Sequence, residues 1–387
     1  MARLTFLMLR TPVGLLVALA VWLGLAGQAA PPRHFATAQN LEETSETSAN
    51  ASFGDLDGDG DLDIVLAKGR HWPLVNRVLL SDLRGSATKG PIGFAASDLA
   101  AKADRSYSTV LADLDGNGTL DLVVSNDRPD GKVVYFNDGH GRFTLGGSWG
   151  APEWTTRNAT VADLNGDGAV DIIAANRGGQ SGFCLNNGAG VFDAAPCVVI
   201  PAESATSIVA ADFNHDGTVD LLVPHRDGGQ SHLYLNDGKA GFARTQPFGP
   251  AVSNARTAAA GDLNGDGWID AVVGDERTGA RVYLNDGTGR LTAGVALGEA
   301  SLSTGAVQIA DLNNDGHADV VIGYYKPGPT PAVFFGAGDG AAFTRVAFGD
   351  GKGAVYGIAI GDINEDGFPD IATARSEAPN VLYLSVR

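Results

Sequence analysis

The sequence predicts an all-β fold, a seven-bladed β-propeller of four-stranded antiparallel blades. A nine-residue acidic segment, seen in full at 163–171, recurs along the chain at intervals of 49 to 58 residues. Its seven copies begin at Asp55, Asp113, Asp163, Asp212, Asp262, Asp311 and Asp362. A period near fifty residues indicates a repeat architecture. Four short strands in each repeat, with no helical period between them, are typical of a propeller blade.

Each repeat contains the signals for four strands in a fixed order. A short strand such as 159–162 precedes the acidic segment, and a β-branched, apolar strand such as 171–175 follows it. The third strand ends in an Asn-Asp-Gly or Asn-Asn-Gly signal, which is typical of a hairpin turn. This signal occurs at 136–139, 185–188, 235–238 and 284–287. The fourth strand is expected to open with Phe143, Phe192, Phe242 or Leu291.

The two ends of the repeat region complement each other. The last repeat stops after its third strand at 381–384, and the segment 34–37 resembles the missing fourth strand. Pairing of this N-terminal strand in the last blade would close the ring and remove open sheet edges, whereas an open solenoid would leave them exposed. We therefore expect one propeller domain over 30–387.

Several aromatic residues recur at comparable places in the repeats. Those at the fourth strands are expected to be core residues: Phe35, Phe94, Phe143, Phe192, Phe242 and Phe343. Four tryptophans could fill gaps between blades or face a ligand: Trp72, Trp149, Trp154 and Trp268.

The acidic segment has the donor pattern of a calcium loop. Oxygen-bearing side chains stand at positions 1, 3, 5 and 9, a backbone carbonyl is available at position 7, and Gly stands at position 6. Calcium accepts six to eight oxygen ligands in flexible geometry, whereas magnesium demands a strict octahedron. An EF-hand is excluded because position 12 is never Glu and strands flank the loop. A set of turns without metal is the simpler alternative, since Asp, Asn and Gly favour turns.

Up to seven Ca²⁺ ions are therefore expected, one for each copy. The predicted ligands are Asp55, Asp57, Asp59, Asp61 and Asp63; Asp113, Asp115, Asn117, Thr119 and Asp121; Asp163, Asn165, Asp167, Ala169 and Asp171; Asp212, Asn214, Asp216, Thr218 and Asp220; Asp262, Asn264, Asp266, Trp268 and Asp270; Asp311, Asn313, Asp315, His317 and Asp319; and Asp362, Asn364, Asp366, Phe368 and Asp370. The formal charge of −18 is explained mainly by these loops, so it says little about partners.

The stretch 53–63, with a strand before its Asp-rich loop and a strand after it, resembles the FG-GAP or VCBS repeat of integrin-alpha-like propellers. The resemblance covers nearly the whole chain after residue 30. It implies that each Ca²⁺ lies between the first and second strands of its blade, on the face opposite the usual ligand surface. The family contains adhesion proteins, lectins and a few polysaccharide lyases, so the resemblance does not define an activity.

The N-terminus has the features of a secretory signal peptide. Arg3 and Arg10 precede an apolar run at 13–26, and cleavage is expected after Ala29. A signal anchor is the alternative. The predicted location is secreted, periplasmic or at the cell surface. Cys184 and Cys197 could form one disulfide, but a tight hairpin near 188–190 would leave them out of register, so the question stays open.

Every repeat carries a cation five to seven residues past position 9. The predicted collar consists of Arg70, Arg128, Arg177, Arg226, Arg277, Lys326 and Arg375, with Lys68 beside Arg70. In a ring these residues would line one mouth, away from the calcium loops, and could bind an anionic ligand such as a uronate or a sulfated glycan. Exposed charge balance, or contacts with neighbouring blades, would explain the same residues without a ligand.

We interpret the chain as a binding or interaction module for an extracellular glycan or protein, with no nucleic-acid partner and no membrane span after signal-peptide cleavage. An enzyme is less favoured. A polysaccharide lyase acting on an acidic glycan is the first alternative, and a structural component of a surface assembly is the second. The candidate acid/base clusters for a lyase are His71 beside Arg70, His225 beside Arg226, and Tyr324 and Tyr325 beside Lys326.

Overall fold

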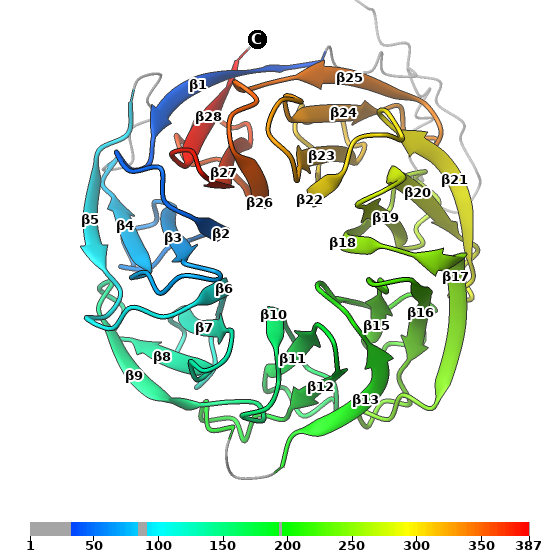
Figure 1. The fold of residues 1–387 in the computed structure, drawn as a ribbon, viewed down its shortest axis with the longest axis horizontal. Coiled ribbons are helices and arrows are strands. Elements are labelled where there is room, and N and C mark those ends of the chain that lie inside the picture. Colours follow the sequence, from blue (N-terminus) through cyan, green and yellow to red (C-terminus); the bar gives the residue numbers. More distant parts are fainter. Residues whose placement is uncertain (1–31, 84–90, 193–195, 387) are drawn as a thin grey trace, which may run out of the picture.

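Seven four-stranded antiparallel sheets stand in chain order around a central axis, as Figure 1 shows. This computed structural model describes residues 32–83, 91–192 and 196–386, and no helix occurs among them. The predicted all-β, seven-bladed fold is confirmed. The described part of the chain contains no helix long and apolar enough to cross a membrane. The predicted signal peptide lies outside the described residues.

The strands of each blade run outward from the axis in sequence order. Blades 1 to 4 consist of β2 (Ser48–Gly54), β3 (Asp63–Lys68), β4 (Arg77–Ser81) and β5 (Phe94–Asp98); β6 (Ser106–Ala112), β7 (Asp121–Asn126), β8 (Val133–Asn137) and β9 (Phe143–Ser148); β10 (Thr156–Ala162), β11 (Asp171–Asn176), β12 (Gln180–Cys184) and β13 (Val198–Glu203); and β14 (Val209–Ala211), β15 (Asp220–Val223), β16 (Gly229–Leu235) and β17 (Arg244–Ser253). Blades 5 to 7 consist of β18 (Ala255–Gly261), β19 (Asp270–Asp275), β20 (Gly279–Asn285) and β21 (Leu291–Leu297); β22 (Thr304–Ala310), β23 (Asp319–Tyr324), β24 (Ala332–Gly336) and β25 (Phe343–Ala347); and β26 (Ala354–Gly361), β27 (Asp370–Ser376), β28 (Val381–Val386) and β1 (His34–Asn40).

The ring is closed by the N-terminal strand, as predicted. β1 is the outer strand of blade 7 and pairs antiparallel with β28, with Phe35 opposite Ser385 and Asn40 opposite Val381. Figure 1 shows the blue β1 beside the red β28. Phe35 is buried in a cluster with Phe348 and Tyr383, so the closing strand contributes to the core as well as to the hydrogen-bonded sheet.

The hydrophobic core lies between neighbouring blades rather than around the axis. The second strands are almost wholly buried, which explains their continuous apolar runs. Of the six phenylalanines expected in the core, Phe35, Phe192 and Phe242 are buried, while Phe94, Phe143 and Phe343 are half-buried and pack against core clusters. Trp149 and Trp154 are buried between blades 2 and 3. The Trp268 ring contacts the His215 ring in a tilted arrangement, with the centroids 4.4 Å apart, whereas Trp72 is 70% exposed.

Cys184 and Cys197 form a disulfide. The tight hairpin considered from the sequence is wrong, because the connection from β12 to β13 is long and Phe183 pairs with Val198. This register brings Cys197 opposite Cys184. Phe192 accordingly lies buried within the connection instead of opening β13.

The Asn of the hairpin signal also links neighbouring blades. The Nδ2 of Asn186, in blade 3, donates to the carbonyl of Leu114 in the acidic loop of blade 2 at 2.8 Å. Asn137, Asn236 and Asn285 make the same bond to the preceding blade. The acidic loops are therefore tied to one another around this part of the ring.

Candidate functional site

All seven acidic loops connect the first and second strands of their blades, at one end of the propeller. In blade 3 the loop leads from β10 to β11, and its Gly168 has a φ of +88°, a conformation that suits glycine. The carboxylate of Asp163 accepts hydrogen bonds from the backbone N–H groups of Gly166, Asp167 and Gly168. The carboxylate at position 1 thus stabilises the turn by accepting hydrogen bonds from three of its backbone N–H groups.

The aspartate at position 9 is completely buried in every copy. In blade 3, one oxygen of Asp171 accepts from the N–H of Leu164 and the other accepts from the N–H of Asn186. Asn186 is the residue that contacts the preceding blade. Position 9 therefore joins its own loop, the end of the third strand and the neighbouring loop, a structural role that the sequence pattern did not reveal.

Three carboxylates converge in each of the first two copies. Oxygens of Asp55, Asp57 and Asp63 lie within 4.8 Å of one another, and one oxygen of Asp57 is buried without a hydrogen-bond partner. Asp113, Asp115 and Asp121 converge in the same way. A third group found among the described residues contains Asp59, Asp61 and Asp82. Such convergence of like charges is unfavourable unless protons or a cation compensate it.

Copies 3 to 7 have Asn at position 3 instead of Asp. In copies 3 to 6 its amide donates to the Asp at position 5, as from Asn165 to Asp167 at 2.8 Å. These loops retain all-oxygen donors for a hard cation, and each has three Asp among positions 1, 3, 5 and 9, as copy 2 has with Asn117 at position 5. The donor chemistry of all seven loops is compatible with calcium.

Burial raises the pKa of all seven position-9 aspartates, and the neighbouring carboxylates raise it further. The pKa reaches about 7 for Asp63, Asp319 and Asp370, and about 6 for Asp220 and Asp270. Without metal, the folded protein thus binds protons at these sites more tightly than the unfolded chain does.

This proton affinity predicts opposite pH effects with and without calcium. In the presence of a chelator, the raised pKa values stabilise the folded state fully below about pH 4. This stabilisation is lost as the pH rises to about 7, because the folded state binds more protons than the unfolded state does in that window. Calcium requires deprotonated ligands, so its stabilising effect should grow over the same window. The difference in Tm between calcium and EDTA, measured from pH 5 to pH 7.5, is expected to increase. A constant difference would contradict the prediction.

A cavity of about 100 Å³ lies on the propeller axis. Its lining includes the residue six positions before each acidic segment, one from every blade: Ala49, Tyr107, Arg157, Thr206, Arg256, Gly305 and Tyr356. The first two strands of a blade are antiparallel, so this cavity is at the end opposite to the acidic loops. We call it the axial pocket.

Bulges direct these side chains. In six blades the lining residue falls within a register shift near the start of the first strand, as Arg157 does between Thr156 and Asn158. A bulge interrupts the ordinary alternation of side chains and re-aims one of them. The same local device therefore presents one residue from each of these blades to the axis.

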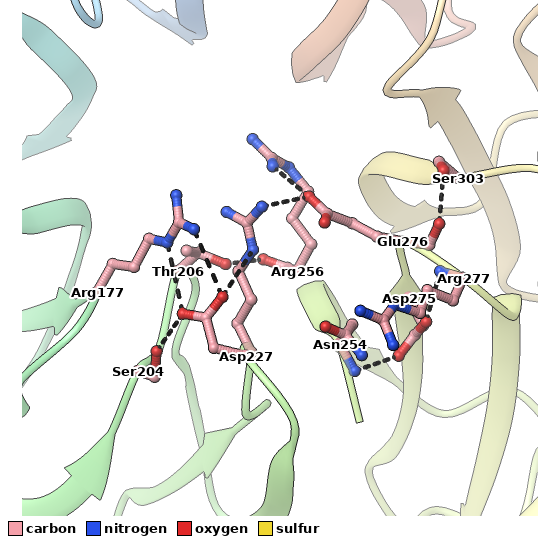
Figure 2. A network of polar contacts seen from close by, with 11 residues as sticks. Arg177, Ser204, Thr206, Asp227, Asn254, Arg256, Asp275, Glu276, Arg277 and Ser303 are labelled. Carbon is pink, nitrogen blue, oxygen red and sulfur yellow. Dashed lines mark hydrogen bonds and ion pairs between the residues drawn. The ribbon is translucent and has the colours of Figure 1, made fainter. Parts of the chain in front are cut away.

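A second set of residues, six positions after position 9, completes the charges around the axial pocket. Arg226 and Arg256 share Glu276, at 2.6 and 2.8 Å from its Oε1 (Figure 2). Arg177 lies 3.4 Å from Asp227, which also accepts a hydrogen bond from Ser204 (Figure 2).

On the other side of the pocket, Arg157 Nη1 lies 2.6 Å from Asp127 Oδ2. Five guanidinium groups thus surround the pocket: Arg70, Arg157, Arg177, Arg226 and Arg256.

Tyrosine rings separate several of these arginines. The Arg70 guanidinium lies 3.4 Å from the centroid of the Tyr356 ring, and that of Arg157 lies 4.2 Å from Tyr107. Arg256 lies 4.4 Å from the Tyr325 ring. Burial, followed by the charges of Arg70 and Arg226, lowers the pKa of Arg256. The pocket therefore concentrates positive charge in a largely buried place.

The predicted collar is only partly assembled at the axial pocket. Arg70, Arg177 and Arg226 line it. Arg128, Arg277 and Lys326 are exposed and are not among its lining residues. Arg375 is buried and bonded to Asp350 and to the carbonyl of Pro379, while Lys68 pairs with Glu42 and Glu46. Of the seven predicted cations, the axial pocket thus brings together only Arg70, Arg177 and Arg226.

A one-residue difference explains this separation. Arg177 and Arg226 are six residues past position 9, whereas Arg128, Arg277 and Lys326 are seven past it and Arg375 is five past it. Arg70 is also seven past, but it has a positive φ of 50° that sets it apart from its counterparts.

Two of the predicted acid/base clusters reach the axial pocket in part. His71 lines it and lies 3.0 Å from the Tyr107 hydroxyl through Nδ1. Tyr325 lines it as well, whereas Tyr324 is buried away from its lining and Lys326 is exposed. His225 lies in a separate groove with Tyr234.

Arg157, Arg256, Tyr107 and Tyr356 were missed from the sequence. Their signal was present, because all four stand six residues before the acidic segment. No periodic apolar pattern marks that column, and it contains Ala and Gly in other repeats. Aligning the seven repeats on position 1 would have identified it.

The fold and its two ends define a class: a seven-bladed propeller with acidic hairpin loops at one end and a basic axial pocket at the other. Residues 113–174, 163–223 and 262–322 match the sequence model of the FG-GAP-like repeat. These three stretches are therefore FG-GAP-like repeats, which confirms the resemblance predicted from the acidic segments. No curated protein sequence matches the chain.

Solved structures with the same architecture show the fold alone, because their sequence identities are low. The BP39L lectin from Burkholderia pseudomallei is 15% identical, with a TM-score of 0.63 over 88% of this chain and 100% of the lectin chain. BBS1N, solved in complex with ARL6DN, is 12% identical, with a TM-score of 0.59 over 92% of this chain and 98% of its own.

Proposed function

We propose that this protein is a binding module that holds an anionic ligand, preferably an acidic carbohydrate, at its axial pocket. The observation that carries the proposal is the convergence of five arginines from blades 1, 3, 4 and 5 on one cavity. Guanidinium groups bind carboxylate, sulfate and phosphate through paired hydrogen bonds. An acidic chain has little reason to concentrate arginines on its axis for general charge balance.

The rim of the pocket supports a carbohydrate. Trp72 follows His71 directly and is 70% exposed. A large exposed aromatic side chain beside a polar pocket offers a flat apolar surface next to an anchor for charge. One propeller of similar fold is a lectin and another was solved with a protein partner, so both ligand classes occur on this architecture.

We also propose that the seven acidic loops hold calcium and that the protein works outside the cytoplasm after removal of residues 1–29. The all-oxygen donor sets and the convergent carboxylates of the first two copies support calcium. The disulfide supports an oxidising compartment. Calcium at these loops would be structural, because the loops lie at the opposite end from the axial pocket.

One observation favours a polysaccharide lyase as the second candidate function. His71 and Tyr107 contact each other beside Arg70 and Arg157, which could neutralise a substrate carboxylate. Burial lowers the pKa of His71, which keeps its imidazole available as a neutral base. An ultraviolet-absorbing unsaturated product from an acidic polysaccharide would establish this activity, and binding without product would favour the binding module.

Replacing Arg177 with Gln is expected to weaken binding of an acidic oligosaccharide by about tenfold, the usual effect of losing one charged hydrogen bond. Its side chain is 38% exposed, so the variant should fold normally. Arg277→Gln is the matched control, since Arg277 belongs to the predicted collar but lies outside the pocket. Affinities from calorimetry and Tm values for both variants test the proposal. Equal affinity in wild type and Arg177→Gln would contradict it.

A further inference from the structure

The charges around the axial pocket do not balance. Five guanidinium groups face three carboxylates: Asp127 with Arg157, Asp227 with Arg177 and, at 3.9 Å, with Arg226, and Glu276 shared by Arg226 and Arg256. Arg70 is in contact with the rings of Tyr356 and Tyr107, and no carboxylate pairs with it among the described residues. The pocket therefore has two positive charges in excess.

The excess is spread over four arginines. Arg177, Arg226 and Arg256 share the carboxylates of Asp227 and Glu276, since Arg226 also lies 3.9 Å from Asp227, and Arg70 has none. The Arg226 and Arg256 side chains are each only 11% exposed, so water screens their charges poorly. The lowered pKa of Arg256, caused by burial and then by Arg70 and Arg226, reflects the same shortage of negative charge.

The cavity is small. Its volume of about 100 Å³ holds a few water molecules or one compact group rather than a whole sugar ring. A carboxylate would supply one charge and two oxygens. A phosphate monoester supplies between 1.5 and 2 charges near pH 7 and three free oxygens. A phosphate monoester therefore matches the two excess positive charges of the pocket better than a carboxylate does.

We propose that the axial pocket accepts one compact tetrahedral oxyanion, a phosphate monoester in preference to a carboxylate, as the pendant group of its ligand. This inference rests on the proposed function and specifies the chemistry of the group that enters the pocket. The sugar that carries the group remains outside, at the rim formed by His71 and Trp72.

Four probes that share a sugar ring test the preference: glucose 6-phosphate, glucose 6-sulfate, glucuronate and glucose. Calorimetry is carried out with calcium present, at about pH 7.5 and constant ionic strength. Glucose 6-phosphate is expected to bind at least about tenfold more tightly than glucuronate, with the sulfate between them and glucose not detected. A sulfate that binds more tightly than the phosphate would show that oxygen geometry, and not charge, determines the choice.

Two variants change the excess charge in opposite directions. Arg70→Gln removes the arginine that has no carboxylate partner, and it should reduce the preference for phosphate over glucuronate to about twofold or less. Glu276→Gln removes the shared carboxylate. It should lower the Tm, bind glucose 6-phosphate more tightly, and regain more Tm from that probe than wild type gains. Because the two variants predict opposite changes, poor folding of one does not remove the test.

The outcomes separate this inference from the proposed function. If glucuronate binds as tightly as glucose 6-phosphate, and acidic oligosaccharides still bind through Arg177, the inference is wrong and the proposed function stands. If none of the anionic probes and no acidic oligosaccharide binds, both are wrong. Arg277→Gln should leave the whole series unchanged, and a changed series in that variant would show a general charge effect instead of a defined pocket.

Discussion

Removal of calcium with excess EDTA is expected to lower the Tm of this protein by about 10–20 °C. If each loop binds with a Kd of about 10⁻⁴ M, then about 1 mM calcium stabilises the fold by about 1.4 kcal/mol for each site, or about 10 kcal/mol for seven. That is comparable with the whole stability of an ordinary domain. Calcium added back should restore the Tm, whereas magnesium should restore it less, because its octahedral geometry is strict.

Loss of calcium from one acidic loop is expected to affect the neighbouring blade as well as the loop itself. Asn186 connects the loop of blade 2 to the third strand of blade 3, and its N–H is held by Asp171. Asp167→Asn, which removes one ligand charge from one loop, should reduce the calcium-dependent Tm shift. Asp237→Asn, in a hairpin turn outside the acidic loops, is the matched control and should retain the full shift. An unchanged Tm in EDTA would show that the loops are turns stabilised by their own hydrogen bonds.

The repeated elements could be predicted because each depends on local chemistry that recurs seven times. The acidic loop, the apolar second strand and the Asn-Asp-Gly turn are contiguous segments, and their period determined the number of blades. The closing strand was also predictable, since 34–37 resembles the one strand missing from the last repeat. The register between β12 and β13 could not be predicted from the sequence, because it depends on a long connection in which Phe192 is buried.

The axial pocket was predicted only in part, for a reason of geometry. The collar cations do not stand at one fixed step after position 9: Arg177 lines the pocket six residues past it, while of the cations seven residues past it Arg70 lines the pocket and Arg277 does not. The bulge that aims Arg157 and Arg256 is a tertiary feature without a local signal. Their column also contains Ala49 and Gly305, so only the superposition of repeats shows that it faces the axis. The repeat pattern therefore predicts the features that all seven copies share. It does not predict the axial pocket, because the pocket is lined by residues that differ between copies.

Phe35→Ala is expected to destabilise the protein by about 3–5 kcal/mol, the usual cost of truncating a buried Phe. Phe35 is 7% exposed, and its ring centroid lies 5.8 Å from that of Phe348 in the preceding blade. Its loss should loosen β1 from β28 and expose an edge of blade 7. Thermal and urea unfolding would measure both the decrease in the free energy of unfolding and any decrease in cooperativity.

Phe94→Ala is the matched control, because Phe94 opens the outer strand of blade 1 but is half-buried and closes nothing. It should cost clearly less, since little apolar surface is lost. The difference between the two variants measures the combined effect of the greater burial of Phe35 and of its place in the closing strand. If both variants unfold alike, β1 serves only as an ordinary outer strand, and the ring must be held by contacts between blades together with the acidic loops.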